Sequence, residues 1–235
     1  MGLSLSYSSS NPAASKDKII ECNKIGNILL DIIDMDIKPR DIITKQSFIN
    51  AVKITGILGG STNAVLHLLA IANEFNIKFT LDDINEALKD IPVLGNLKPM
   101  GEFSMNDIYR IGGTPRIINY LINKNILDGN TLTMTGDSLK KSLDKLFLKK
   151  CSFNQKIVYP ITSPLYNQSH IRVMKGNLCP GGAIGKINTN KILKKIVRVY
   201  NSEDAMITAL KNNEIKKEHA VIIRYQGPKG GPGMP

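Results

Sequence analysis

The sequence runs Gly59-Gly60-Ser61-Thr62-Asn63-Ala64-Val65-Leu66-His67-Leu68-Leu69-Ala70-Ile71-Ala72 at the end of its first quarter. Two glycines and three small polar residues precede apolar residues spaced three and four apart. That spacing predicts an amphipathic helix, and Asn63 is a good N-cap for it. The segment therefore predicts a glycine loop that leads into a helix packed on a core. The apolar face of this helix comprises Val65, Leu68, Leu69, Ala72 and Phe75.

The loop at residues 59–63 supports two interpretations of about equal weight. A helix N-terminus carries free N–H groups and a partial positive charge, which suit carboxylates and phosphates. The same residue types also make an ordinary helix cap, with the glycines forming a tight turn. On the first interpretation the candidate ligand-binding residues are Gly59, Gly60, Ser61, Thr62 and Asn63.

A second glycine loop closes the chain, as Gly227-Pro228-Lys229-Gly230-Gly231-Pro232-Gly233-Met234-Pro235. It lacks the spacing of a phosphate-binding P-loop. Lys229 can neutralise an acidic ligand, so Lys229, Gly230 and Gly231 are further candidates for the lining of a site. A soluble domain gains nothing by stopping inside such a loop, so we expect the sequence to be an internal piece of a larger protein.

The amino-acid composition argues against a disordered chain, a membrane protein, a nucleic-acid-binding protein and a disulfide-stabilised protein. The 235 residues are 42% hydrophobic, which is enough for a packed core, and no apolar run reaches the roughly 18 residues of a membrane helix. The net charge of +11 is spread along the chain and the aromatic content is only 6%, which favours a compositional origin over a nucleic-acid interface. Three cysteines without CxxC spacing argue against a disulfide framework and favour a reducing compartment.

The N-terminal part of the chain has mainly helical patterns. The spacing predicts a helix over residues 19–34, stopped by Pro39, and a second helix capped by Ser47 that runs into Gly59. Capping boxes open two further helices, with Thr80 and Asp83 in the first and Ser104 and Asp107 in the second. Pro115 fits the first turn of the next helix, and a last one carries Leu139, Leu143, Leu146 and Phe147.

Short β-type runs dominate after about residue 151. The expected strands are residues 132–135, 156–161, 171–174, 183–187, 196–200 and 220–225, and one helix over Glu203 to Lys211 interrupts them. Residues 160–168 have the composition of a linker. We therefore expect an α/β chain with one domain over residues 1–160 and another over residues 161–235.

No metal or catalytic cluster stands out from residue spacing. His67 has no cysteine or histidine at ligand spacing and is expected to be packed or capping, and His170 and His219 are isolated too. Carboxylates such as Asp82 and Asp83 fall in helix first turns, where the macrodipole explains them. No catalytic residue and no metal ligand is assigned.

Several motifs carry a family resemblance. Residues 59–72 resemble the hallmark segment of the dihydroxy-acid dehydratases, an iron–sulfur family that also contains phosphogluconate and sugar-acid dehydratases. Residues 174–183 (Met174-Lys175-Gly176-Asn177-Leu178-Cys179-Pro180-Gly181-Gly182-Ala183) resemble the start of the family's C-terminal domain, and residues 221–235 resemble another signature. The segments 79–83, 97–101, 112–115 and 132–136 follow the family in order, so the resemblance spans essentially the whole chain.

The resemblance implies a hydro-lyase that converts 2,3-dihydroxy carboxylic acids to 2-keto acids in valine, leucine and isoleucine biosynthesis. It implies an iron–sulfur cluster, [2Fe–2S] or [4Fe–4S], and Mg²⁺ in the intact enzyme, a small-molecule dihydroxy acid as substrate, and a homodimer. Neither nucleic acid nor membrane is expected as a partner. The implied location is the cytoplasm, or the mitochondrion or plastid of a eukaryote. The implied fold is the later part of an α/β domain followed by the first strands of a β-barrel-like swivelling domain, both incomplete.

The sequence departs from the family where the chemistry is expected. The Cys-Asp-Lys and Cys-Gly-Gly motifs that hold the cluster do not occur, and Cys22, Cys151 and Cys179 do not match them. The lone chain is therefore expected to hold no cofactor and to be inactive. Open strand edges should make it associate or dissolve poorly. The alternatives are a fragment of a phosphogluconate or sugar-acid dehydratase, a non-catalytic basic binding module, and a scaffold subunit.

Overall fold

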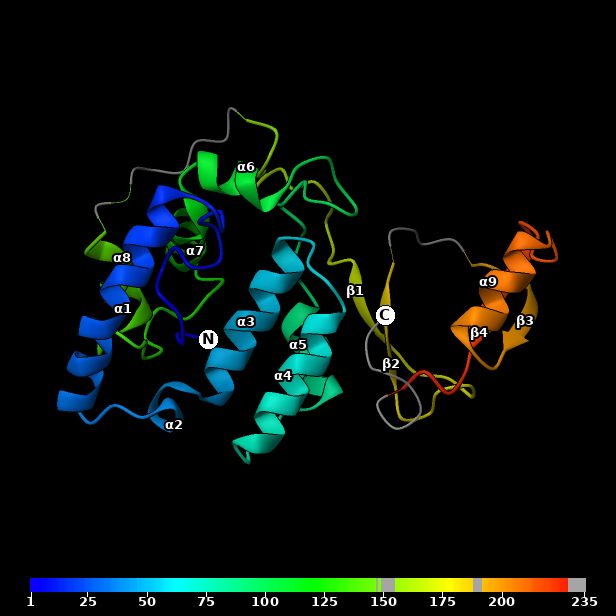
Figure 1. Ribbon diagram of the computed structural model, residues 1–235, viewed down its shortest axis with the longest axis horizontal. Coiled ribbons are helices and arrows are strands. Elements are labelled where there is room, and N and C mark those ends of the chain that lie inside the picture. The colour runs from blue at the N-terminus through cyan, green and yellow to red at the C-terminus, as the bar shows by residue number, and fades with distance from the viewer. Residues whose placement is uncertain (147, 149–154, 188–191, 228–235) are drawn as a thin grey trace. The chain divides into compact units, whose positions relative to one another are not determined.

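The computed structural model describes residues 1–146, 148, 155–187 and 192–227, and it forms two compact units. The first unit spans Met1–Ile187 and the second spans Asn188–Pro235. In the first unit the helices precede the strands along the chain (Figure 1). Its elements are α1 (Lys16–Asp34), α2 (Pro39–Ile42), α3 (Lys45–Ile57), α4 (Asn63–Glu74), α5 (Leu81–Leu88), α6 (Met105–Arg110), α7 (Gly113–Asn123), α8 (Leu139–Asp144), β1 (Ile171–Met174) and β2 (Ala183–Lys186).

The core of the first unit forms where α3 packs against α4 and against α5 (Figure 1). The rings of Phe48 in α3 and Phe79 before α5 stack with their centroids 5.1 Å apart. Ile84 and Ile57 are completely buried beside them. Apolar positions at helical spacing thus bring three helices together around one aromatic pair.

Strands β1 and β2 pair antiparallel, with Ile171 opposite Lys186 and Met174 opposite Ala183. Strand β1 contacts α5, and Ile171 is buried in the same core. This small sheet therefore belongs to the helical unit.

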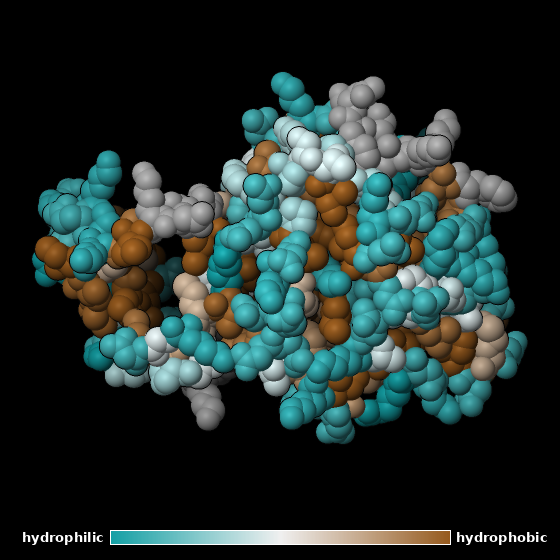
Figure 2. Space-filling model, turned by 180° about the vertical axis from the view of Figure 1, so that it is seen from behind, coloured by the Kyte–Doolittle hydropathy of each residue, from teal (hydrophilic) through white to brown (hydrophobic). Residues whose placement is uncertain are grey.

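The second unit is a β–α–β segment in which β3 (Ile196–Tyr200) pairs parallel with β4 (His219–Ile223), with α9 (Glu203–Lys211) between them. Parallel strands are normally covered on both faces. Here four of the five residues of β3 are exposed. Hydrophobic residues at the surface of the molecule are brown in Figure 2. This unit has little core of its own among its described residues, of which only Ala209 is a buried hydrophobic residue.

Several expected elements are confirmed and others are wrong. The capping boxes at Thr80 and Ser104 open α5 and α6, and α9 has the predicted bounds. Ser47 does not cap α3: Thr44 does, accepting a hydrogen bond from the Ser47 amide, while Ser47 is the third helical residue. Asn63 likewise is the first residue of α4, and Thr62 precedes it as the N-cap.

The expected strand at residues 132–135 is wrong because the chain turns there. Gly136 has φ +77°, and the amides of Thr133 and Gly136 are bonded within the turn. Residues 156–161 are not a strand either, since Val158 makes only an isolated bridge with Gly95. Helix α8 ends at Asp144, and Phe147 lies outside the described residues.

The mixed α/β class is confirmed, with helices dominating the part of the chain before residue 145 and the strands lying after residue 170. The described strands form two separate two-stranded sheets. The domain division at residue 160 and the barrel-like second domain stay predictions.

A buried histidine lies just before β1. His170 is 3% exposed, its ring packs edge-on against Tyr166 at 4.5 Å, and neither ring nitrogen has a hydrogen-bond partner among the described residues. Burial lowers the pKa of His170 below its ordinary value, and the positive charges of Lys186 and Arg172 lower it further. Folding therefore disfavours the protonated form of this imidazole relative to the unfolded chain.

The aromatic pair sets a first prediction. Replacing Phe48 by Ala should lower the free energy of unfolding by about 3–5 kcal/mol, because it removes a completely buried ring and leaves a cavity. Urea denaturation measures the loss. Leu66→Ala, on the exposed side of α4, is the control and should change stability by less than about 0.5 kcal/mol. Equal losses in the two variants would contradict the assignment of the core.

His170 sets a second prediction, on pH. The unfolded chain takes up a proton near the ordinary pKa of 6.5, whereas the folded chain resists protonation until lower pH. The free energy of unfolding should therefore fall by up to about 1.4 kcal/mol per pH unit as the pH drops below 6.5. His170→Phe keeps a ring beside Tyr166 and should make this slope shallower, while the buried amino group of Met1, whose pKa burial also lowers, keeps part of it. His67→Phe should leave the slope unchanged. Denaturant titrations at pH 7.0, 6.0 and 5.5 decide between these outcomes.

Candidate functional site

The glycine loop lies between α3 and α4 at a point where two backbones nearly touch. Gly59 has φ +68°, a conformation that residues with a Cβ rarely adopt. A Cβ on Gly60 would lie 2.7 Å from Thr55 Cγ2, and one on Gly95 would lie 3.0 Å from the carbonyl oxygen of Leu58. The positive φ of Gly59 and the close packing at Gly60 therefore explain why glycine occupies both positions, which agrees with the interpretation of the loop as a tight turn before a helix cap.

The polar half of the loop leaves two donors open. The amide of Asn63 donates to Ser61 Oγ at 3.2 Å, and the amides of Ala64 and Val65 donate to the carbonyls of Ser61 and Thr62. Among the hydrogen bonds between described residues, none uses the amide of Ser61 or of Thr62. Ser61 is exposed and Thr62 is half-buried, and the two amides lie directly before the 12-residue helix α4, where an anion can be received.

Lys186 at the end of β2 lies against the same loop. Its Nζ donates to the carbonyl oxygen of Gly59 at 3.0 Å, and burial lowers the pKa of Lys186 below its ordinary value. The ammonium adds positive charge beside the α4 N-terminus. Sequence reasoning missed Lys186, because a single lysine 127 positions away carries no local signal of this contact.

The structure does not bring all predicted site residues together. Lys229, Gly230 and Gly231 lie outside the described residues. His67 is exposed, so the expectation that it packs or caps is wrong. His219, at the start of β4, accepts a hydrogen bond at Nδ1 from the backbone amide of Lys216.

The described residues do not fit an iron–sulfur cluster or Mg²⁺. Among them, no three His, Cys, Asp or Glu side chains form a group able to hold a metal ion. Cys22 is exposed and Cys179 is half-buried, both as free thiols, and Cys151 is not described. No step of a reaction is therefore assigned to either cofactor here.

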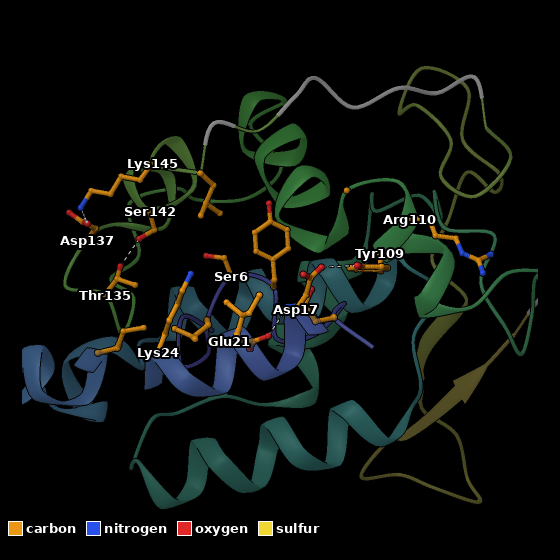
Figure 3. A pocket seen from close by; sticks show the side chains of 17 residues that line it. Ser6, Asp17, Glu21, Lys24, Tyr109, Arg110, Thr135, Asp137, Ser142 and Lys145 are labelled. Carbon is orange, nitrogen blue, oxygen red and sulfur yellow. Dashed lines mark hydrogen bonds and ion pairs between the residues drawn. The ribbon is translucent and has the colours of Figure 1, made fainter. Parts of the chain in front are cut away.

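A cavity of about 790 Å³ lies elsewhere in the first unit, and Figure 3 shows it from close by. Residues of the loop 59–63 do not line it. Helix α1 contributes Asp17, Glu21 and Lys24, and the segment around α8 contributes Thr135, Asp137, Ser142 and Lys145. Apolar side chains such as Ile20, Ile28 and Leu146 line the cavity together with these polar groups.

The carboxylates of this cavity are paired. Hydrogen bonds from Lys141 and Lys145 hold the pKa of Asp137 below its usual range. Burial acts to raise the pKa of Glu21, but hydrogen bonds from Ser8, Lys18 and Asn11 outweigh it and the pKa is lowered. Because these groups neutralise one another, the open amides of the glycine loop are the better candidate for an anion.

In the described part of the chain, no helix combines the length and hydropathy required to cross a membrane.

Comparison with known proteins identifies the family to which the chain is similar. Residues 1–142 match the model of the dihydroxy-acid/6-phosphogluconate dehydratase N-terminal domain, and residues 156–235 match the model of the C-terminal domain. A mitochondrial dihydroxy-acid dehydratase of Aspergillus fumigatus is 44% identical over the whole chain, which covers 39% of that enzyme. The dihydroxy-acid dehydratases of Flavobacterium psychrophilum and Francisella tularensis subsp. novicida are 42% and 39% identical over the whole chain, and it covers 42% of each.

The chain thus spans about two fifths of the length of these relatives, and each of them aligns with it from end to end. It belongs to the dihydroxy-acid/6-phosphogluconate dehydratase family.

Proposed function

We propose that the chain is part of a dihydroxy-acid dehydratase, which converts 2,3-dihydroxy carboxylic acids to 2-keto acids in branched-chain amino-acid biosynthesis. The observation that carries the proposal is the match over the whole chain to enzymes of that name, at 39–44% identity. In the net reaction the C2 proton and the C3 hydroxyl leave as water, and the resulting enol becomes the ketone. None of the described residues is assigned the proton transfer.

The part we assign to this chain is substrate binding at the glycine loop. The amides of Ser61 and Thr62 precede α4 and are not used by a hydrogen bond between described residues, so they can donate to the carboxylate of a dihydroxy acid. Lys186 on Gly59 strengthens the positive potential there. Lys229, Gly230 and Gly231 stay proposed as lining residues of the active site in the intact enzyme.

The catalytic centre is proposed to need residues outside this sequence. The intact enzyme would carry an iron–sulfur cluster and Mg²⁺, and the lone chain would hold neither and would be inactive. We further propose two partial domains, over residues 1–160 and 161–235, the second contributing the first strands of a barrel-like domain of the intact enzyme. The intact enzyme would be a homodimer without nucleic-acid or membrane partners, in the cytoplasm or, in a eukaryote, in the mitochondrion or plastid.

A sugar-acid substrate is the alternative, because the family model also covers 6-phosphogluconate dehydratases. The relatives described above bear the dihydroxy-acid name, which favours the branched-chain reaction.

A chimera tests the activity. Residues 1–235 would replace the matching segment of the Francisella tularensis subsp. novicida enzyme, whose aligned region is 237 positions long. We expect the chimera to dehydrate a branched 2,3-dihydroxy acid at a rate within about tenfold of the parent, a barrier change of about 1.4 kcal/mol. It should not act on 6-phosphogluconate, and the lone chain should show no turnover. A folded, cofactor-loaded chimera that prefers the sugar acid, or turns over neither acid, would refute the proposal.

Two substitutions at one position of the same chimera test the loop. Thr62 has φ −61°, which proline also adopts, so Thr62→Pro removes the open amide and leaves the helix start in place. Since a hydrogen bond to a charged group contributes about 1.5–3 kcal/mol, KM should rise about tenfold or more. Thr62→Ala removes only the side chain, which makes no capping bond, and should change KM less than twofold. Indistinguishable KM values for the two variants would remove the loop from the site.

A further inference from the structure

Two charged side chains in the cavity between α1 and α8 have no ion-pair partner among the described residues. They are Asp17 and Lys24, and Figure 3 shows both directed from α1 toward the cavity. Oδ2 of Asp17 accepts a hydrogen bond from the hydroxyl of Tyr109 at 2.7 Å, and no hydrogen bond between described residues uses its Oδ1. None of these bonds uses Nζ of Lys24 either. One carboxylate oxygen and one ammonium are therefore open to a ligand.

The two charges lie on one face of α1 with an apolar side chain between them. Asp17, Ile20 and Lys24 follow one another at intervals of three and four residues, which places them on the same side of a helix. Ile28 continues this face, and all four residues line the cavity. Ile20 is 51% exposed, so its aliphatic surface is accessible. Asp17 and Lys24 are two turns apart, a rise of about 10 Å along the helix axis.

The opposite wall of the cavity adds hydroxyl groups and apolar surface. The hydroxyls of Thr135 and Ser142 lie 2.9 Å apart and bond to each other. Leu5 and Leu146 add aliphatic surface. The lining holds as many carboxylates as cationic side chains, namely Asp17, Glu21 and Asp137 against Lys24, Arg110 and Lys145. A ligand with a net charge therefore finds no excess of counter-charge, whereas a ligand that carries both charges finds a partner for each.

The spacing of the two open charges fits an α-amino acid. With hydrogen bonds of about 2.8 Å at both ends, an α-amino acid spans about 9 Å between a carboxylate oxygen and an ammonium nitrogen of the protein. The helix rise between Asp17 and Lys24 is slightly longer than this. A helical side chain leans toward the helix N-terminus, so the long side chain of Lys24 shortens the gap.

We propose that this cavity binds an aliphatic α-amino acid. Its ammonium donates to Oδ1 of Asp17, its carboxylate accepts from Nζ of Lys24, and its side chain packs on Ile20 and Ile28. The volume of about 790 Å³ lies in the range of small-molecule pockets and leaves room for water. Because Asp17 and Lys24 are both exposed, the binding is weak and becomes weaker as the salt concentration rises.

The ligand class connects this cavity with the function proposed above. Aliphatic amino acids are the end products of branched-chain amino-acid biosynthesis, so a site for them outside the glycine loop would let them regulate the intact enzyme. The regulatory role rests on the proposed function. The binding itself rests on the cavity alone and does not depend on the dehydratase assignment.

Calorimetric titration of the full 235-residue chain with L-leucine tests the ligand class. We expect saturable binding. Three control compounds each lack one group of leucine: isocaproate lacks the ammonium, isoamylamine lacks the carboxylate, and glycine lacks the aliphatic side chain. Each should bind about tenfold more weakly or worse, because a charged hydrogen bond or the burial of the side chain is lost. A chain that does not bind leucine, or that binds any control compound as tightly, would overturn the proposal.

Substitutions on α1 test the two contacts. Lys24→Met and Asp17→Asn each remove one charge and nearly keep the shape of the side chain, and each should raise the Kd of leucine about tenfold. Lys16→Met and Asp90→Asn make the same charge changes at exposed residues outside the cavity lining, and should leave the Kd within about twofold. Circular dichroism checks that all four variants are folded. Equal affinities in folded Lys24→Met or Asp17→Asn and the unmodified chain would contradict the assigned contacts.

Amide chemical shifts separate this cavity from the glycine loop. In the isotope-labelled chain, leucine should cause saturable shifts within residues 17–28 and 135–146. Shifts confined to residues 61 and 62 would mean that the leucine carboxylate occupies the glycine loop. That result would overturn the cavity as an amino-acid site and leave the proposed function standing.

Discussion

The close approach of two backbones at Gly95 positions the rest of the first unit. The amides of Leu94 and Gly95 both donate to the carbonyl of Ile57, at 2.8 and 3.0 Å, where α3 ends. A Cβ at residue 95 would lie 3.0 Å from the carbonyl oxygen of Leu58, so a side chain there would require the Leu58 backbone to move. The same segment bonds through Val93 to Tyr166, the residue that packs on His170 before β1. One glycine contact thus links the helical core, the glycine loop and the small sheet.

This constraint explains why a site can form on backbone atoms. With the end of α3 fixed, the chain turns through Gly59 and Gly60 before α4 begins, and the amides of Ser61 and Thr62 are left without a hydrogen bond to a described residue. Lys186 reaches Gly59 from β2, and β2 is placed by its pairing with β1 on α5. The positive charge at the loop is therefore a product of tertiary structure.

The sequence predicts features that depend on hydrogen bonds within one helical turn, but it does not predict contacts between distant segments. The boxes at Thr80 and Ser104 and the bounds of α9 follow from bonds within one helical turn, so pattern alone finds them. The caps at Ser47 and Asn63 were misplaced because several neighbouring polar residues qualify and tertiary contacts choose among them. The segment at residues 132–135 has strand-forming residues, yet the turn at Gly136 and the hydroxyl contacts of Thr133 and Thr135 with Ser142 keep it irregular.

The spacing of apolar residues also predicts a local property, the presence of a helix, without predicting its tertiary contacts. It located α1 correctly, but the pattern reports that a helix has an apolar face and does not report what covers it. The loop at residues 59–63 was found from its residue types, whereas the choice between a cap and an anion site needed the hydrogen-bond partners of each amide. Lys186 had no signal at all, because its role depends on a strand pairing that brings residues 59 and 186 together.

The glycine loop as a carboxylate site is the central claim, and amide chemical shifts test it on the unmodified chain. A branched 2,3-dihydroxy carboxylate would be titrated into isotope-labelled protein, with the uncharged methyl ester of the same acid as the control. The account predicts saturable shifts of the Ser61 and Thr62 amide resonances with the acid and none with the ester. Shifts that cluster in the cavity between α1 and α8, or no shifts at residues 61 and 62 at saturating acid, would contradict it.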